Sequence, residues 1–227
     1  MNLKTRIINK IETVNPLAVL RRKKMRKQLT NDNITFLIPN CGGGTLFHDL
    51  GLQFKSPTIN LMMYQNEFLQ FVLHLDAYIN NELVFYKHEE FSFPCAVLKA
   101  NDLPDVHIHF THYESEEEAK EKWDSRKKRI NKNNMFVFLA ERDGITKDDI
   151  LKLAQLNVKG IVCFTCNDYS DIPYQVYISK YHEDGETGNI LRRHYWNDSK
   201  EYEQYFDFIK WFNEADGFPY DVSRFRK

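Results

Sequence analysis

Short apolar runs set between turn residues predict the strands of this chain. An uninterrupted apolar run of about four to eight residues, bounded by Gly, Pro, Asn or Asp, is typical of a buried strand. Such runs are ITFLI (34–38), TINLMM (58–63), ELVFY (82–86), CAVLK (95–99), VHIHF (106–110), MFVFLA (135–140) and GIVCFT (160–165), and YQVYI (174–178) is a further candidate.

Between these runs, apolar positions that recur every three or four residues predict helices. A short helix follows the glycines at 42–44, and longer ones are expected over 67–80, 115–133, 146–156 and 200–212. Ser115 and Glu118 form a capping box at the start of the clearest of them. Upstream, Pro16 divides two short basic helices, over about 3–14 and 17–29.

Strand and helix alternate from residue 106 to residue 165, which is the pattern of βαβ units. The predicted fold class is α/β, with three α/β/α layers around a mostly parallel or mixed, Rossmann-like sheet. We expect a basic helical segment over residues 1–30 and a single α/β domain over 31–227. Ligands of open α/β sheets bind beyond the carboxyl ends of the strands, so the loops PNCGGG, THYES, ERDGIT and TCNDYSD are expected to share one rim.

Charge is distributed unevenly along the chain. Residues 1–29 hold nine Lys or Arg and one acid, although the net charge of all 227 residues is −1. A basic segment of this kind can dock at anionic lipid headgroups. Nucleic-acid binding is disfavoured, because the body is acidic and the basic stretch lacks interleaved aromatic residues. The absence of an apolar signal segment and the four cysteines predict a cytoplasmic protein, with peripheral membrane contact through residues 1–29 as a further hypothesis.

The loop NCGGG at 40–44 is the first candidate site. Glycines between a strand and a helix allow close backbone approach, and the helix start attracts anions, so Asn40, Gly42, Gly43 and Gly44 are candidate ligand-binding residues. The positive end of the helix dipole would also stabilise a thiolate at Cys41, with His112 or His48 as its base. The alternatives are a purely structural turn and a cysteine that serves as a small buried hydrophobe.

Other candidates lie further along the chain. Trp123, Arg126 and Arg129 share one helix face, either as a sugar- and phosphate-binding surface or as a core anchor with ion-pair partners. Arg142 and Asp143 follow a strand and belong either to a site or to a turn. His107 and His109 face the same way on a strand, but no accompanying motif supports a metal, and we predict none. Cys163 and Cys166 are interpreted as packing residues.

Three segments carry a family resemblance. NCGGGTLFHDLGLQFKSPTINLMM, HYESEEEAKEKWDSRKKRIN and FLAERDG resemble the bacterial family catalogued as domain of unknown function 1919, whose members are often labelled exopolysaccharide biosynthesis proteins. The resemblance implies an α/β fold and a place in exopolysaccharide or capsule synthesis, but no particular reaction and no particular cofactor. Ser56 and His112 lie within these segments and join the site candidates.

Two functions stay open at this point. The first is a transferase acting on an activated donor, either a nucleotide-sugar or an acyl-CoA, with Cys41, His112 and Asp143 as catalytic residues. The second is a non-catalytic module that binds a nucleotide-sugar or glycan beside a membrane polysaccharide synthesis complex. Both take a small phosphorylated or sugar ligand.

Overall fold

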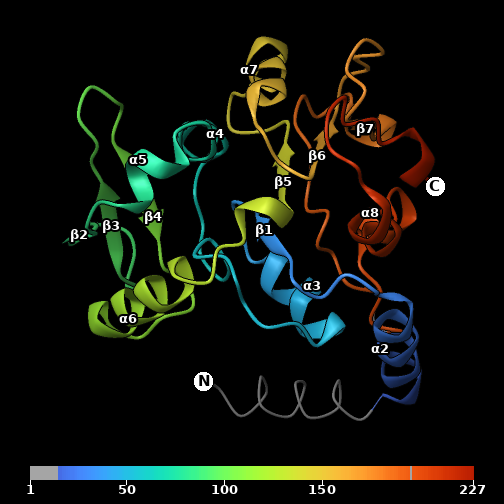
Figure 1. Cartoon of the computed structure of the whole chain (residues 1–227), viewed down its shortest axis with the longest axis horizontal. Coiled ribbons are helices and arrows are strands. Elements are labelled where there is room, and N and C mark those ends of the chain that lie inside the picture. Colours follow the sequence, from blue (N-terminus) through green and yellow to red (C-terminus); the bar gives the residue numbers. More distant parts are fainter. Residues whose placement is uncertain (1–14, 195) are drawn as a thin grey trace.

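A computed structural model describes residues 15–194 and 196–227. It contains a four-stranded parallel sheet and a three-stranded antiparallel sheet, with helices around both (Figure 1). The chain therefore has the predicted mixed α/β fold, with a mostly parallel principal sheet. The finer three-layer, Rossmann-like description stays a prediction, as does the division of the chain at residue 30.

The parallel sheet has the strand order β1-β5-β6-β7. Its strands are β1 (Thr35–Leu37), β5 (Met135–Ala140), β6 (Gly160–Thr165) and β7 (Gln175–Tyr177). All six residues of β5 and all six of β6 are buried. Because the central strands of a parallel sheet are covered on both faces, they are apolar throughout instead of alternating. Four of the predicted strands are confirmed here.

The antiparallel sheet, of order β2-β3-β4, is made by the middle of the chain. It consists of β2 (Val84–Tyr86), β3 (Cys95–Leu98) and β4 (Val106–His109). The prediction that β4 feeds the parallel sheet is wrong, because β4 pairs only with β3 in the named sheets. The predicted strand at 58–63 is also wrong. Asn60 has a positive φ of 64°, which breaks an extended run, and Met62 alone bridges to His109.

Seven α-helices lie within the described residues. They are α2 (Pro16–Gln28), α3 (Gly42–Leu50), α4 (Gln65–Leu73), α5 (Leu75–Ile79), α6 (Glu116–Lys127), α7 (Lys147–Lys152) and α8 (Phe208–Glu214). The helix predicted over 67–80 is divided at His74, whose φ of −122° is not helical. The helix predicted over 200–212 is likewise divided, because Asp207 caps α8 by accepting from the amide of Lys210. The helix predicted over 3–14 lies outside the described residues.

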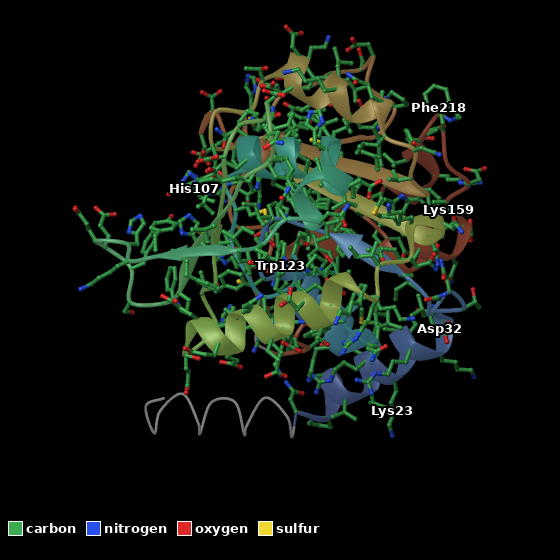
Figure 2. The ribbon with its side chains drawn as sticks, turned by 60° about the vertical axis from the view of Figure 1, so that its left-hand side comes forward. Lys23, Asp32, His107, Trp123, Lys159 and Phe218 are labelled. Atoms are coloured by element: carbon green, nitrogen blue, oxygen red, sulfur yellow. The ribbon has the colours of Figure 1, made fainter. Side chains whose placement is uncertain are left out.

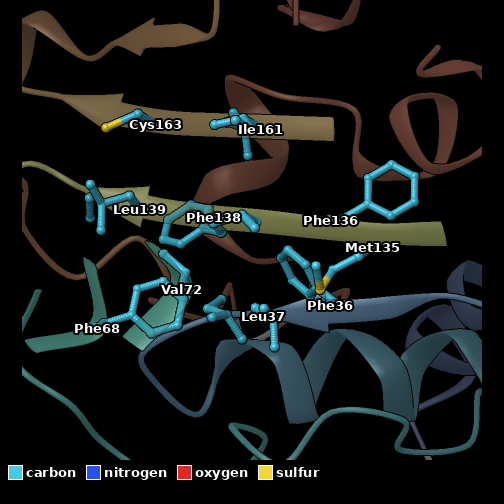
Figure 3. Packing of buried hydrophobic residues seen from close by; sticks show 14 of the residues in the cluster. Phe36, Leu37, Phe68, Val72, Met135, Phe136, Phe138, Leu139, Ile161 and Cys163 are labelled. Atoms are coloured by element: carbon cyan, nitrogen blue, oxygen red, sulfur yellow. The ribbon is translucent and has the colours of Figure 1, made fainter. Parts of the chain in front are cut away.

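Aromatic side chains fill the space between the parallel sheet and α8. Phe136 of β5 contacts Trp211 with ring centroids 4.8 Å apart and Phe212 at 5.1 Å. Phe36 of β1 reaches Phe212 at 5.4 Å. Figure 3 shows part of this hydrophobic core, in which Phe68 and Val72 of α4 lie against the parallel sheet. This packing fixes the carboxyl end of β1, from which the glycine loop leaves.

A buried histidine lies on the antiparallel sheet. His109 is 2% exposed, and its Nδ1 lies 3.5 Å from Sγ of Cys95. Its Nε2 is buried without a hydrogen-bond partner in the described part of the chain. Burial, with smaller contributions from His88 and His107, lowers the pKa of His109 to about 4. The imidazole is therefore held neutral in the folded protein.

This histidine makes the stability depend on pH. The unfolded chain binds a proton at His109 near pH 6.5, whereas the folded chain does so only near pH 4, so the free energy of unfolding decreases as the pH falls through that window. Between pH 7.5 and 4.5 we expect a loss of about 2.5 kcal/mol from this group. Urea unfolding of His109→Phe should show a correspondingly weaker pH dependence. The exposed His74, changed to Phe, serves as the control, and equal slopes for both variants would contradict the prediction.

Candidate functional site

Cys41 stands where β1 gives way to α3. The side-chain oxygen of Asn40 accepts a hydrogen bond of 2.9 Å from the amide of Gly42, which closes a tight turn after the strand. Cys41 occupies the N-cap position of α3 but makes no side-chain capping bond. Its thiol is therefore available to groups outside the helix, and the residue is partly exposed.

His112 approaches Cys41 from the other sheet. It lies just beyond the end of β4, in a turn in which the amide of Tyr113 donates to the carbonyl of Phe110. Its Nε2 is 3.0 Å from Sγ of Cys41. A thiol and an imidazole at this distance form a possible nucleophile and base, because the ring nitrogen can accept the thiol proton. The sequence left His112 and His48 as alternatives for the base, and the structure places His112 at this distance from Cys41.

The pair opens into a cavity of about 510 Å³. Its wall comes from α2, α3, the segment after α3, the turn at His112 and the segment before residue 201. The lining residues are Arg22, Cys41, Gly44, Thr45, His48, Asp49, Phe54, Asn60, His112, Arg193, Asp198 and Lys200. The size suits a small ligand or part of a larger one.

A cluster of buried charged residues forms part of the cavity wall, whereas Phe54 contributes an apolar part. Lys200, 2% exposed, donates to the carboxylate of Asp198 at 3.0 Å, and that carboxylate also pairs with Arg22 at 3.1 Å and with Arg193 at 3.0 Å. Burial lowers the pKa of Lys200 against the opposing influence of Asp198 and Asp49. With Asp49 included, the cavity is lined by two arginines, one lysine and two carboxylates, so its charge favours an anionic ligand.

Comparison with known proteins places the chain in a family. The model of the family described as Domain of unknown function (DUF1919) matches residues 14–213. The chain belongs to this family. A Haemophilus influenzae protein described as an uncharacterized protein is 37% identical over 193 residues, which cover 85% of this chain and 90% of that protein. The matched region of this DUF1919 protein includes every residue that lines the cavity.

The glycines of the loop differ in their surroundings. A side chain on Gly43 would overlap Ile38 of the core, and one on Gly42 would meet Leu191 at 2.6 Å. Gly44 lines the cavity and lies under the side chain of Asn60. Close packing accounts for Gly42 and Gly43, and also for Gly44, where a side chain would overlap the amide of Asn60. A ligand-binding role of the loop stays a prediction.

Asp143 and Arg142 do not line the cavity, which corrects the expectation of one shared rim. Both belong to the turn after β5, where Asp143 has a φ of 55° and accepts from the amide of Gln65 at 3.3 Å. Nε of Arg142 lies 3.5 Å from that carboxylate. The expectation failed because the carboxylate of Asp143 is turned to α4, where it accepts from the first amide of that helix. Of the three predicted catalytic residues, the structure brings together Cys41 and His112 but not Asp143.

Four further candidates lie outside the cavity. Trp123 is 1% exposed and packs on Phe71 and Phe110, so it is a core residue. Arg126 is buried and donates to the carbonyl of Ile59 at 2.8 Å. Arg129 lies with Arg126 along a separate groove beside Phe54. The hydroxyl of Ser56 is buried and bonds to that of Thr58.

Sequence reasoning missed most of the charged wall. It placed Arg22 only in a basic segment and Lys200 only at the first position of a predicted helix, and it singled out Asp198 for no role. The pairing of Arg22 with Asp198 joins α2 to a segment more than 170 positions away in the sequence. A single sequence carries no signal for such a contact. His48, in contrast, was a candidate and does line the cavity, with its side chain largely exposed.

The remaining histidine and cysteine candidates have other partners. His107 bonds through Nδ1 to Glu67 at 2.6 Å. Cys163 is fully buried, and the thiol of Cys166 donates to Glu141 at 3.2 Å. In the described part of the chain, no three His, Cys, Asp or Glu side chains are grouped so as to hold a metal ion.

Proposed function

We propose that this DUF1919 protein is a transferase in which Cys41 is the nucleophile and His112 the general base. The supporting observation is the 3.0 Å approach of His112 Nε2 to Cys41 Sγ inside a cavity large enough for a substrate. Nucleophilic catalysis by cysteine requires a base within hydrogen-bond reach, and this pair meets the requirement. The two residues come from different sheets, so the fold itself assembles the pair.

An acyl thioester such as an acyl-CoA is the donor that suits this chemistry. Sγ of Cys41 attacks the acyl carbonyl carbon as its proton passes to His112, and the proton then goes to the departing thiolate of the donor. A hydroxyl of the acceptor attacks the new thioester, gives its proton to His112, and Cys41 leaves as the thiolate, which takes the proton back. The exopolysaccharide context implied by the family resemblance makes a sugar hydroxyl the acceptor that we propose.

Groups around the pair have supporting roles. The first amides of a helix have no acceptor within the helix, so the amide of Gly44 is available to the oxyanion formed during each attack. Arg22, Arg193 and Lys200 supply positive charge for the phosphates of an activated donor. The phosphates of a nucleotide-sugar would bind to the same positive charges, but sugar transfer from it does not need a thiol nucleophile such as Cys41.

Alkylation tests the pair directly. With iodoacetamide at pH 7, we expect Cys41 to be modified at least tenfold faster than Cys95, Cys163 and Cys166, because those three are buried. His112→Ala should slow the modification of Cys41 by roughly tenfold or more, because a general base contributes about 10²–10⁴-fold in reactions of this kind. Mass spectrometry of the four cysteine peptides gives each rate, and His48→Ala is the matched control within the same cavity.

Incubation with acetyl-CoA tests the transferase. The expected product is an acetyl group on Cys41, seen in the mass of the intact protein and removed by hydroxylamine, and absent from Cys41→Ser. Unmodified protein after incubation with short and long acyl-CoAs, together with equal stabilisation of the wild type and Cys41→Ser by nucleotide-sugars, would contradict the transferase and favour a non-catalytic binding module.

A further inference from the structure

One face of α2 is exposed and carries both apolar and basic side chains. Leu17 and Leu20 are 50% and 61% exposed. At 3.6 residues per turn, positions 17, 20, 24 and 27 follow one side of the helix, and position 23 adjoins them. The exposed residues of this face are Leu17, Leu20, Lys23, Lys24 and Lys27. No acidic residue occurs within the helix.

Trp196 extends this face beyond the helix. Its side chain is 72% exposed, and its carbonyl accepts a hydrogen bond of 3.0 Å from the side chain of Asn15. Asn15 is the N-cap of α2 and also accepts from the amide of Leu17. Trp196 is therefore held beside the end of the helix that carries the leucines. Three of the seven exposed large hydrophobic residues of the described chain lie in this one region.

The opposite side of α2 is fixed to the body. Arg21 pairs with Asp49 at 2.8 Å, Arg22 pairs with Asp198, and Arg26 donates to the backbone of Asp49 at 2.9 Å. The three lysines of the exposed face form no ion pair within the described residues. The exposed face is thus held in a fixed orientation and its charges are available to a partner.

We propose that this face of α2, together with Trp196, docks the protein on a bilayer that contains anionic lipids. Leucine and tryptophan side chains can enter the headgroup region, where tryptophan is favoured, and lysines beside them attract anionic headgroups. An acidic protein surface would match the lysines but not the exposed leucines and tryptophan. No helix in the described part of the chain is long and apolar enough to span a membrane, so docking at the surface is the mode that fits.

Docking would place the cavity close to the membrane. Arg22 lines the cavity from the side of α2 that faces the body, while Leu20 and Lys24 lie on the exposed side. The cavity is then separated from the headgroups by about one helix diameter, roughly 10 Å. This inference does not rest on the proposed transferase, because it concerns the outer surface of the helix and not the Cys41–His112 pair.

Co-sedimentation with vesicles tests the docking surface. The full chain is mixed with vesicles of phosphatidylcholine alone or with one third phosphatidylglycerol, in low salt and at 0.5 M NaCl. We expect binding only to the anionic vesicles and loss of it at high salt. Lys23→Gln with Lys27→Gln should reduce the partition coefficient roughly 30-fold, the factor that corresponds to about 1 kcal/mol for each lysine. Leu20→Ser with Trp196→Ser should reduce it roughly tenfold or more.

Matched controls come from exposed residues elsewhere. Lys87→Gln with Lys128→Gln removes the same charge, and Leu151→Ser with Phe218→Ser removes similar exposed apolar area. Phe218 and Lys23 lie far apart on the molecule (Figure 2). The proposal is overturned if the full chain binds neither vesicle, if it binds both equally, or if the controls weaken binding as much as the α2 variants do. A failed acylation experiment with intact vesicle binding would remove only the transferase.

Discussion

Trp123→Ala should lower the free energy of unfolding by about 3–5 kcal/mol, the cost of truncating a large aromatic residue in a core. Trp123, labelled in Figure 2, is 1% exposed. Its ring centroid lies 6.1 Å from that of Phe71 and 6.4 Å from that of Phe110. The cavity left by the indole could not be filled without moving both rings. Chemical denaturation monitored by circular dichroism measures the loss.

Two control variants distinguish a core anchor from a ligand-binding residue. The indole nitrogen of Trp123 is buried without a hydrogen-bond partner in the described structure, so Trp123→Phe loses no hydrogen bond and should cost less than half as much as Trp123→Ala. Trp196→Ala, at an exposed position, should change the stability by no more than about 0.5 kcal/mol. A Trp123→Ala protein as stable as the wild type would contradict the core assignment.

The sequence left the role of Trp123 open, whereas the apolar runs were informative about the fold. Apolar runs were sufficient for seven strands, because buried strands of parallel sheets are apolar on both faces and short edge strands are bounded by turn residues. The pattern could not assign strands to sheets. VHIHF looks the same whether it pairs with CAVLK or enters the parallel sheet, since the pairing is decided by long-range contacts. Apolar content also misled at TINLMM, where the positive φ of Asn60 breaks the strand.

The candidate site shows the same division between local and distant information. The turn Asn-Cys-Gly is local, and its placement of Cys41 at the start of a helix follows from strand, glycine and helix signals in one stretch. His112 was selected because it ends a strand, and it does meet Cys41, although the two strands lie in different sheets. Asp143 satisfied the same rule and does not reach the cavity. A position at the end of a strand therefore reduced the number of candidate catalytic residues, but it did not identify which of them meet.

The charged wall has a further consequence for stability and binding. Asp198 is 7% exposed and is the shared partner of Arg22, Arg193 and Lys200. Its φ of 61° is in the left-handed region, which Asn tolerates about as well as Asp, so Asp198→Asn removes the charge without adding backbone strain. Loss of this buried carboxylate leaves Lys200 and Arg22 with only the more distant Asp49, at 3.9 and 4.0 Å, as a counter-charge, at a cost of about 3–5 kcal/mol.

Asp198→Asn should therefore unfold at clearly lower denaturant concentration than the wild type, and Lys200→Met added to it should restore part of the loss, because the most buried of the three cations is then gone. Asp124→Asn is the matched control. Asp124 also pairs with two lysines, but at a partly exposed position of α6, where ion pairs contribute at most about 1 kcal/mol. Equal losses for Asp198→Asn and Asp124→Asn would contradict the assignment of a buried charge network.

The same substitution should strengthen anion binding while it weakens the fold. With Asp198 neutralised, the cavity has three cations and one carboxylate, so inorganic phosphate should raise the melting temperature of Asp198→Asn more than that of the wild type at the same ionic strength. A ligand that binds only the native state stabilises it by RT ln(1 + [L]/Kd), and the comparison with chloride removes the effect of screening. If phosphate shifts both proteins equally, these cations do not form an anion site. A larger shift in the variant would mean that the carboxylate of Asp198 opposes the binding of an anion to these cations.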